Sequence, residues 1–303
     1  MDQQLRPTLF ERLIALIVDF LILGIIGYIS GMFFEDFYVS LGKYGTLIGS
    51  TITIVYFSVL QSKIGHGQTL GKLAIGAKVT DLKGEYLGIG KSFLRSLIVF
   101  FPIMNVEMFS SGNGMPIIVS LMVLAIFTSF YFIFVNKSRR CLHDILVSSI
   151  VIKKDVTEFE INEPNDRSTK KLIPIGIFAA VMFGVFLYQT FTENAFSQLL
   201  TLKQKIEARK EVISVNEINS NTTTSYLNDA PPRIYSSVKM TVRINDKQEA
   251  SNVNSKYFDE LYQIIKTEIP ESQDMDGVTI TLYYGYNIGI ANKTQSVTRT
   301  FER

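Results

Sequence analysis

The feature that most constrains this chain is a series of long apolar runs, almost free of charge, in the first two thirds of the sequence. An α-helix needs about 20 mostly apolar residues to cross a bilayer, and the runs are close to that length. Five runs qualify: Leu13–Phe34, Tyr44–Leu60, Phe93–Phe109, Pro116–Val135 and Leu172–Phe191. We therefore expect an α-helical polytopic membrane protein with about five transmembrane helices in the lipid bilayer.

The third run is the least regular of the five. It is short for a span and contains Pro102, Asn105 and Glu107, so a full crossing and a re-entrant or interfacial helix both remain open. At the N-terminus, Leu13–Phe34 is too long for the apolar core of a signal peptide and lacks a clear small-residue cleavage site. We expect it to remain as a span.

Basic residues in the connections predict the orientation, because Lys and Arg near span ends accumulate on the cytoplasmic side. Residues 63–95 and 137–171 carry many basic residues, whereas residues 35–43 carry only Lys43 and residues 110–115 carry none. We expect a cytoplasmic N-terminus and place everything after Phe191 on the outer face. The expected location is a cell membrane of the bacterial type.

Two short strand patterns follow the second run. Residues 74–80 and 85–89 flank Asp81-Leu82-Lys83-Gly84, a sequence suited to a tight turn, which predicts a small cytoplasmic β-hairpin. Residues 147–152 are a candidate third strand. The predicted organisation is a membrane domain with four hydrophobic segments (1–154), a cytoplasmic linker (155–171), a fifth transmembrane helix (172–191) and an extracytoplasmic domain (192–303).

The last third of the chain has the patterns of a small soluble α+β domain. Residues 198–213 have the apolar spacing of a helix, and residues 220–232, with a Thr-rich start and two final prolines, predict a loop. Strand, helix and strand patterns follow at 235–244, 257–265 and 278–286, and 297–301 is a candidate final strand.

The composition argues against several classes of function. The net charge is +2, without the clustered Lys and Arg of a nucleic-acid footprint, so we expect no nucleic-acid partner. One Cys and two His leave no plausible structural zinc site, and the outer domain contains neither residue, so we expect no metal, no cofactor and no enzymatic activity. Gly65–Lys72 looks like a phosphate-binding loop, but a required Gly is misplaced and Leu73 replaces the Ser or Thr.

A few ionisable residues in or beside the spans form the candidate site. Arg12 and Asp19 lie two helical turns apart on the first run, so they share one helix face. A carboxylate within a span needs a cation, a donor or water, and Arg95 and Asp144 are candidates to converge on Asp19. Two interpretations remain open: an ion or proton site, and a structural ion pair that only orients the helices. His143 is a weaker candidate, because a solvated interfacial histidine has the same pattern.

These residues resemble the RDD family, named for an arginine and two aspartates that match Arg12, Asp19 and Asp144. The likeness also covers Gly67–Lys72, Asp81–Gly84, Arg95 and Leu142-His143-Asp144, within roughly residues 5–154. The departure is Val147-Ser148-Ser149, where such proteins usually have a small residue and then Gly-Thr. The resemblance implies a multi-span module, and some members are thought to move monovalent cations in exchange for protons.

Two functional hypotheses follow. In the first, the chain is a transporter or transport subunit for monovalent cations or protons, because an ionisable residue inside a span marks a functional site by default. In the second, the membrane module is an anchor, and the outer domain of this non-catalytic scaffold or sensor binds a protein or envelope component.

Overall fold

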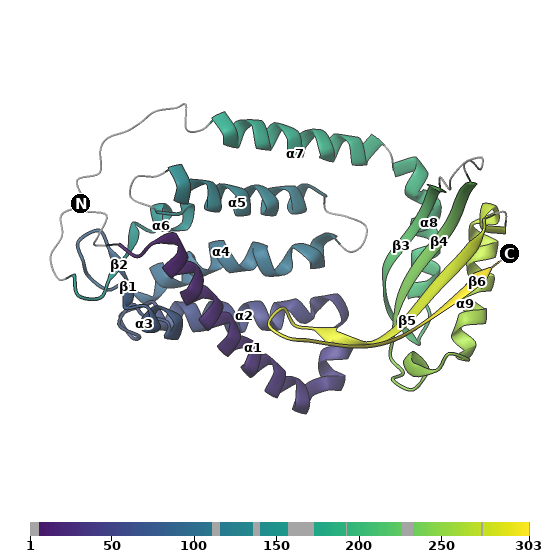
Figure 1. Cartoon of the computed structure of the whole chain (residues 1–303), viewed down its shortest axis with the longest axis horizontal. Coiled ribbons are helices and arrows are strands. Elements are labelled where there is room, and N and C mark those ends of the chain that lie inside the picture. The colour runs from purple at the N-terminus through teal and green to yellow at the C-terminus, as the bar shows by residue number, and fades with distance from the viewer. Residues whose placement is uncertain are drawn as a thin grey trace. The chain divides into compact units, whose positions relative to one another are not determined.

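The computed structural model describes residues 6–110, 116–135, 140–156, 173–191, 193–225, 233–273 and 275–302 (Figure 1). The chain divides into two compact units. The first comprises residues 1–33, 46–187 and 288–291, and the second comprises residues 34–45, 188–287 and 292–303.

Long apolar helices build the first unit. They are α1 (Leu9–Ser40), α2 (Thr46–Leu60), α4 (Ile89–Ser110), α5 (Pro116–Val135) and α7 (Ile173–Phe191). Phe34 has non-helical angles (φ −122°, ψ 25°), so α1 bends there, and the rest of α1 belongs to the second unit. Helix α4 packs against both α2 and α5. The third apolar run is one continuous helix that contains Pro102, rather than a re-entrant pair.

Within the described residues, two helices are long and apolar enough to cross a membrane: Leu9–Ser40 and Ile89–Val106. A shorter apolar helix covers Ile118–Ser129. Helix α1 also carries large apolar side chains that are mostly exposed, including Leu21 (63%) and Ile25 (60%). Exposed apolar surface of this extent is typical of a contact with lipid or with another protein.

The core of the first unit lies where α1, α2 and α4 meet. Its buried members are Leu23, Ile54, Phe57 and Phe100. The rings of Phe57 and Phe100 lie 4.3 Å apart between centroids, which adds an aromatic contact to the buried area. Ile290, from the short segment 288–291 of this unit, packs against the same cluster.

A two-stranded sheet and two one-turn helices lie at one end of these helices. Strands β1 (Ala77–Asp81) and β2 (Ser149–Lys153) pair antiparallel, with Val79 opposite Val151. The short helices are α3 (Leu70–Ala74) and α6 (Leu142–Leu146).

The predicted hairpin was wrong in its second strand. The turn forms, since Gly84 N–H donates to Asp81 O at 3.2 Å, but Leu87 makes only an isolated bridge with Ser62 and α4 begins at Ile89. Strand β1 pairs instead with the candidate third strand. Asp81 Oδ1 accepts the backbone N–H groups of Lys83 and Glu85, and this local turn ends the strand, while pairing with β2 buries β1 side chains.

The second unit contains a four-stranded sheet and two helices. Its elements are α8 (Glu193–Glu207), β3 (Val212–Ser225), β4 (Arg233–Ile244), α9 (Lys256–Glu268), β5 (Gly277–Asn287) and β6 (Asn292–Glu302). The strand order is β3-β4-β5-β6, antiparallel except for the parallel β4–β5 pair. Helix α9 connects that parallel pair and buries Phe258, Leu261 and Ile265.

The structure confirms the strand, helix and strand patterns of the last third and places the candidate final strand in β6. Two other predictions were wrong. The helix expected over 198–213 ends at Glu207, and residues 220–225, expected as loop, continue β3. Thr222, Thr223 and Thr224 are β-branched and suit a strand once β4 lies beside them, and this long-range pairing overrides the local pattern. The remaining residues of the predicted loop, and most of the predicted linker, lie outside the described residues.

Candidate functional site

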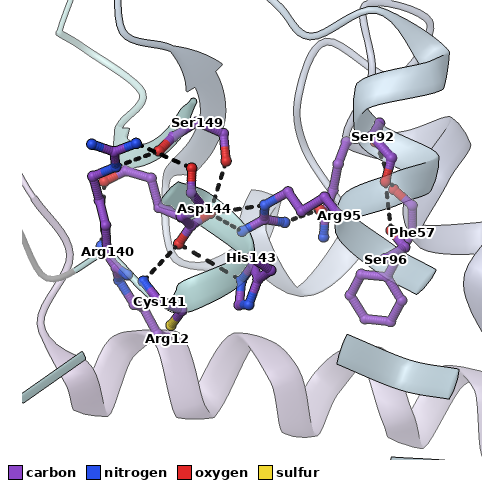
Figure 2. A network of polar contacts seen from close by, with 12 residues as sticks. Arg12, Phe57, Ser92, Arg95, Ser96, Arg140, Cys141, His143, Asp144 and Ser149 are labelled. Carbon is purple, nitrogen blue, oxygen red and sulfur yellow. Dashed lines mark hydrogen bonds and ion pairs between the residues drawn. The ribbon is translucent and has the colours of Figure 1, made fainter. Parts of the chain in front are cut away.

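Asp144 is the centre of a buried polar cluster in the first unit (Figure 2). The Arg95 guanidinium on α4 donates to Asp144 Oδ1 from Nε and from Nη2, both at 2.9 Å. Ser149 Oγ donates to the same oxygen at 2.9 Å, and the Cys141 backbone N–H donates to Oδ2 at 3.3 Å. Asp144 is only 1% exposed, so one cation and two neutral donors replace the water that its charge has lost.

Arg140, which precedes α6, bridges α6 and the start of β2. Its Nε donates to Ser149 O at 3.0 Å, and its Nη2 donates to Asp144 O at 3.1 Å. Between these carbonyls, Ser148 adopts a left-handed conformation with φ 56°. A side chain disfavours that region, which glycine enters freely. A glycine at position 148, which the resemblance leads one to expect, would adopt this backbone without strain.

Asp19 lies in a second buried cluster and is 0% exposed. Its Oδ1 accepts from Tyr56 Oη and from the Gly71 backbone N–H, both at 2.7 Å, and its Oδ2 accepts from Thr69 Oγ1 at 2.6 Å. Thr69 also caps α3 by accepting the Lys72 backbone N–H at 3.3 Å. Asp19 thus fixes the start of α3 against α1 and α2.

Gly71 is required for this approach. A Cβ at position 71 would lie 1.9 Å from the backbone oxygen of Ala15 and 2.9 Å from Asp19 Cγ. Only glycine lets α3 come this close to α1. The Thr69-Leu70-Gly71-Lys72 sequence is therefore a packing motif in which the hydroxyl and the backbone amide recognise a carboxylate.

The predicted site residues form two clusters rather than one around Asp19. Arg95 pairs with Asp144, whereas Asp19 is held by Tyr56, Thr69 and Gly71. Arg12 Nη2 donates to Val151 O at 3.4 Å, so it reaches β2. His143 Nε2 lies 3.7 Å from Asp144 Oδ2, and its side chain is 12% exposed rather than solvated.

A cavity of about 500 Å³ lies beside both clusters. Its wall contains four of the five predicted residues, Arg12, Arg95, His143 and Asp144, whereas Asp19 is not among the described lining residues. The polar part of the wall is completed by Gln61, Lys72, Ser96, Ser129 and Cys141. The other lining residues are aliphatic or aromatic and come mostly from α1, α4 and α5.

Burial and neighbouring charges shift the ionisation of the groups at this wall. Burial alone would raise the pKa of Asp144, but the opposing effect of Arg95 prevails and holds the pKa well below its usual range. Burial lowers the pKa of His143 to about 4, against the opposing effect of Asp144. Burial raises the pKa of the Cys141 thiol to about 12, with a further contribution from Asp144. At neutral pH, Asp144 is therefore charged, and His143 and Cys141 are neutral.

Lys72 is the group at the wall whose charge changes near neutral pH. Burial, together with the nearby charges of Arg95 and Arg12, lowers its pKa to about 7 against the opposing effects of Asp19 and Asp144. Its ammonium lies 5.5 Å from the centre of the Phe57 ring. A lysine that gains and loses a proton at physiological pH can act as a proton-binding group.

Cys141, His143 and Asp144 could together offer three ligand atoms within 4.8 Å of one another to a metal ion. The electrostatics oppose such a site. Asp144 Oδ1 already accepts hydrogen bonds from Arg95. The Cys141 thiol remains protonated at neutral pH because its pKa is raised to about 12. A divalent cation would also face Arg12 and Lys72 at the same cavity wall.

Residues 6–148 match the model of the RDD family. These residues form an RDD-family domain. Neither the curated proteins nor the solved structures contain a significant match to the chain. The C-terminal region lies outside the RDD match, and its sheet forms a separate part of the chain. The RDD match and the apolar helices together indicate a membrane protein.

Sequence reasoning missed several residues that complete the RDD site. Tyr56, Gln61 and Ser149 hydrogen-bond with the three charged residues of the two clusters. They are neutral polar residues of kinds that are common in any sequence. No local pattern therefore marks them as part of the site. Lys72 is, in the sequence, only one of the many basic residues of the connection 63–95. Its place directly after Gly71 was the available signal, because Gly71 packs closely against Ala15 and Lys72 lines the neighbouring cavity.

Replacing Lys72 with methionine is expected to remove a pH dependence of stability. The pKa of Lys72 is about 7 in the folded protein and near its ordinary value of 10.5 when unfolded, so the folded state binds fewer protons between these values. Stability therefore rises with pH across this window, and the penalty for charging the ammonium is fully present below pH 7. Thermal unfolding in detergent at pH 6.5 and 9.5 should show this rise in the wild type and a smaller rise in Lys72→Met. Equal rises would contradict the assignment.

Proposed function

We propose that this chain is a multi-pass protein of a cell membrane and that its RDD domain transports protons through the cavity. The proposal gives the chain five spans, α1, α2, α4, α5 and α7, a cytoplasmic N-terminus and an extracytoplasmic C-terminal domain. Helix α2 is the shortest, at 15 residues or about 22 Å, and the helical turn Gly42–Gly45 precedes it. The basic connections support this orientation.

The observation that carries the proposal is the position of Lys72 at the wall of the cavity. The cavity brings together a lysine whose pKa lies near neutrality, a histidine, and the Arg95–Asp144 ion pair. Ionisable groups that face an internal cavity of a membrane domain are typical of proton and ion pathways. Protonation of Lys72 adds a positive charge beside Arg95. This charge changes the electrostatic interaction between the cavity wall and a solute in the cavity.

Asp19 has a positioning role in this proposal. Its carboxylate oxygens accept from a backbone amide and two hydroxyl groups, and these bonds set the position of α3 and hence of Lys72. The Arg95–Asp144 pair in turn fixes the opposite wall.

Proton flux into sealed liposomes that contain the purified protein tests the proposal. A pH-sensitive dye inside the vesicles reports flux driven by a sodium or a potassium gradient, with protein-free liposomes as the background. Wild type should show flux above background and Lys72→Met should not. Lys91→Met is the matched control, because it removes an exposed lysine on α4 and should retain the flux.

The same experiment separates the two functional hypotheses. If correctly folded wild type shows only background flux with either cation, transport by the RDD domain is contradicted. The scaffold hypothesis, in which the C-terminal domain binds a protein or envelope component, would then be favoured. If Lys72→Met and Lys91→Met carry equal flux, the protein transports protons by a route that does not use the cavity lysine.

A further inference from the structure

Lys72 adds a cation to a cavity wall whose described carboxylate is already paired. Among the described lining residues, the cationic side chains are Arg12, Lys72 and Arg95, and the carboxylate is Asp144. Asp144 is already bonded to Arg95. Asp19 lies close enough to influence Lys72, but its oxygens are occupied by Tyr56, Thr69 and Gly71. A Lys72 ammonium that contacts no carboxylate among the described residues favours an anion at the wall, because a charge away from water is costly without a partner.

Lys72 is the group best placed to contact such an anion. Its side chain is half-buried and lines the cavity, and the described residues provide an aromatic ring, not a carboxylate, as the contact of its ammonium. Buried His143 Nδ1 also lacks a hydrogen-bond partner among the described residues, and His143 lines the same cavity. A bound oxyanion would accept a hydrogen bond from both groups, with the neutral imidazole protonated on Nδ1.

The rest of the cavity is apolar. Its lining includes Leu9, Leu13, Leu16, Phe20, Val99, Phe100, Ile103 and Ile126. Leu13 on α1 and Ile103 on α4 are 52% and 38% exposed, so the apolar wall is accessible from the surroundings of the helices. A wall with cations at one end and apolar side chains over the remainder is complementary to a molecule with an anionic head and an apolar chain.

We propose that the RDD cavity binds an anionic amphiphile, with its oxyanion head at Lys72 and His143 and its alkyl chain along the apolar wall of α1, α4 and α5. A carboxylate or a phosphate head fits this chemistry. The inference stands apart from proton transport, because binding is measured without a gradient. Binding of the amphiphile is nevertheless coupled to protonation, because an anion beside Lys72 stabilises the ammonium form. Binding therefore takes up a proton.

A matched set of probes tests the inference by native mass spectrometry of the full-length protein in non-ionic detergent. Hexadecanesulfonate has a head of constant charge, hexadecanol has none, hexadecyltrimethylammonium is cationic, and methanesulfonate is the head without the chain. We expect retention of one hexadecanesulfonate per chain and little retention of the other three. Competition by hexadecanoate or by hexadecyl phosphate then identifies the preferred head group.

Variants locate the head group. Lys72→Met should weaken binding of hexadecanesulfonate roughly tenfold or more, as loss of a charge-assisted hydrogen bond predicts, whereas the exposed control Lys91→Met should bind as wild type does. Wild-type affinity should fall as the pH rises from 6.5 to 8.5, because the free ammonium deprotonates near pH 7. Lys72→Arg keeps its charge and should lose this pH dependence.

Three results would overturn the inference. Equal retention of hexadecanol or of the cationic probe would show an apolar site without charge recognition. Equal affinities of Lys72→Met and Lys91→Met would place the head group elsewhere. Binding of methanesulfonate as tight as that of hexadecanesulfonate would show a site for a free anion rather than for an amphiphile. Because Lys72→Met removes a poorly solvated charge, we expect it to fold.

Discussion

Replacing Asp144 with alanine is expected to destabilise the RDD domain by about 3–5 kcal/mol, the usual effect of breaking a buried ion pair on one side. The variant leaves the guanidinium of Arg95, which is only 7% exposed, without its carboxylate. It also leaves Ser149 Oγ and the Cys141 N–H without the acceptor they share. Thermal or denaturant unfolding of the purified protein, followed by circular dichroism, measures the effect.

Three further variants make the Asp144 result specific. Asp155→Ala removes an exposed carboxylate and should leave stability nearly unchanged. Asp144→Asn keeps an acceptor for Arg95 and should lose less than Asp144→Ala. The double variant Arg95→Met with Asp144→Leu should recover much of the loss, because no buried charge then lacks a partner. The ion-pair account is contradicted if Asp144→Ala and Asp155→Ala are equally stable.

Replacing Gly71 with alanine is expected to destabilise the domain by about 3 kcal/mol, from overpacking and from the loss of a hydrogen bond to a charged group. The new Cβ would stand 1.9 Å from Ala15 O, which is backbone and cannot rotate away. Helix α3 must therefore move off α1, and the bond from Gly71 N–H to Asp19 is lost. Because Lys72 follows in the same helix, the variant should also lose proton flux.

Gly90→Ala is the control for this substitution. Gly90 lies at the start of α4, and a Cβ there would meet no atom within 4 Å. Alanine favours helix, so this variant should be as stable as wild type or slightly more stable. If Gly71→Ala unfolds at the same temperature as Gly90→Ala, the close packing of α3 on α1 does not hold the site together.

The parts of the fold that follow from local patterns could be predicted from the sequence. The helical spacing around Phe258, Leu261 and Ile265 predicts α9, and alternation predicts β4 and β5. Length and apolarity likewise place α5 at the residues expected. These elements need no knowledge of distant residues.

The parts that depend on distant partners could not be predicted in the same way. Strand β1 lies 72 residues before its partner β2, and the nearer segment 85–89 had an equally good strand pattern. Asp19 takes its donors from 37, 50 and 52 residues along the chain. The sequence pointed to the charged residues of the two clusters, because ionisable residues in or beside apolar runs are conspicuous, but it did not point to Lys72. It gave no means of choosing which cation meets which carboxylate, since that choice depends on how the helices pack.

In the proposed function, protons pass through the RDD cavity, and a natural cysteine in the cavity wall allows a direct test of this role. Cys141 is the only cysteine and lies in the cavity wall. The decisive measurement is proton flux after alkylation with N-ethylmaleimide, with the extent of reaction at Cys141 read from peptide masses, because the neutral amine of Lys72 can also react. The raised pKa of the thiol makes the reaction slow but does not prevent it. We predict that flux falls in proportion to the fraction of Cys141 alkylated, and that Cys141→Ser is insensitive to the reagent. Unchanged flux in fully alkylated protein would contradict the account.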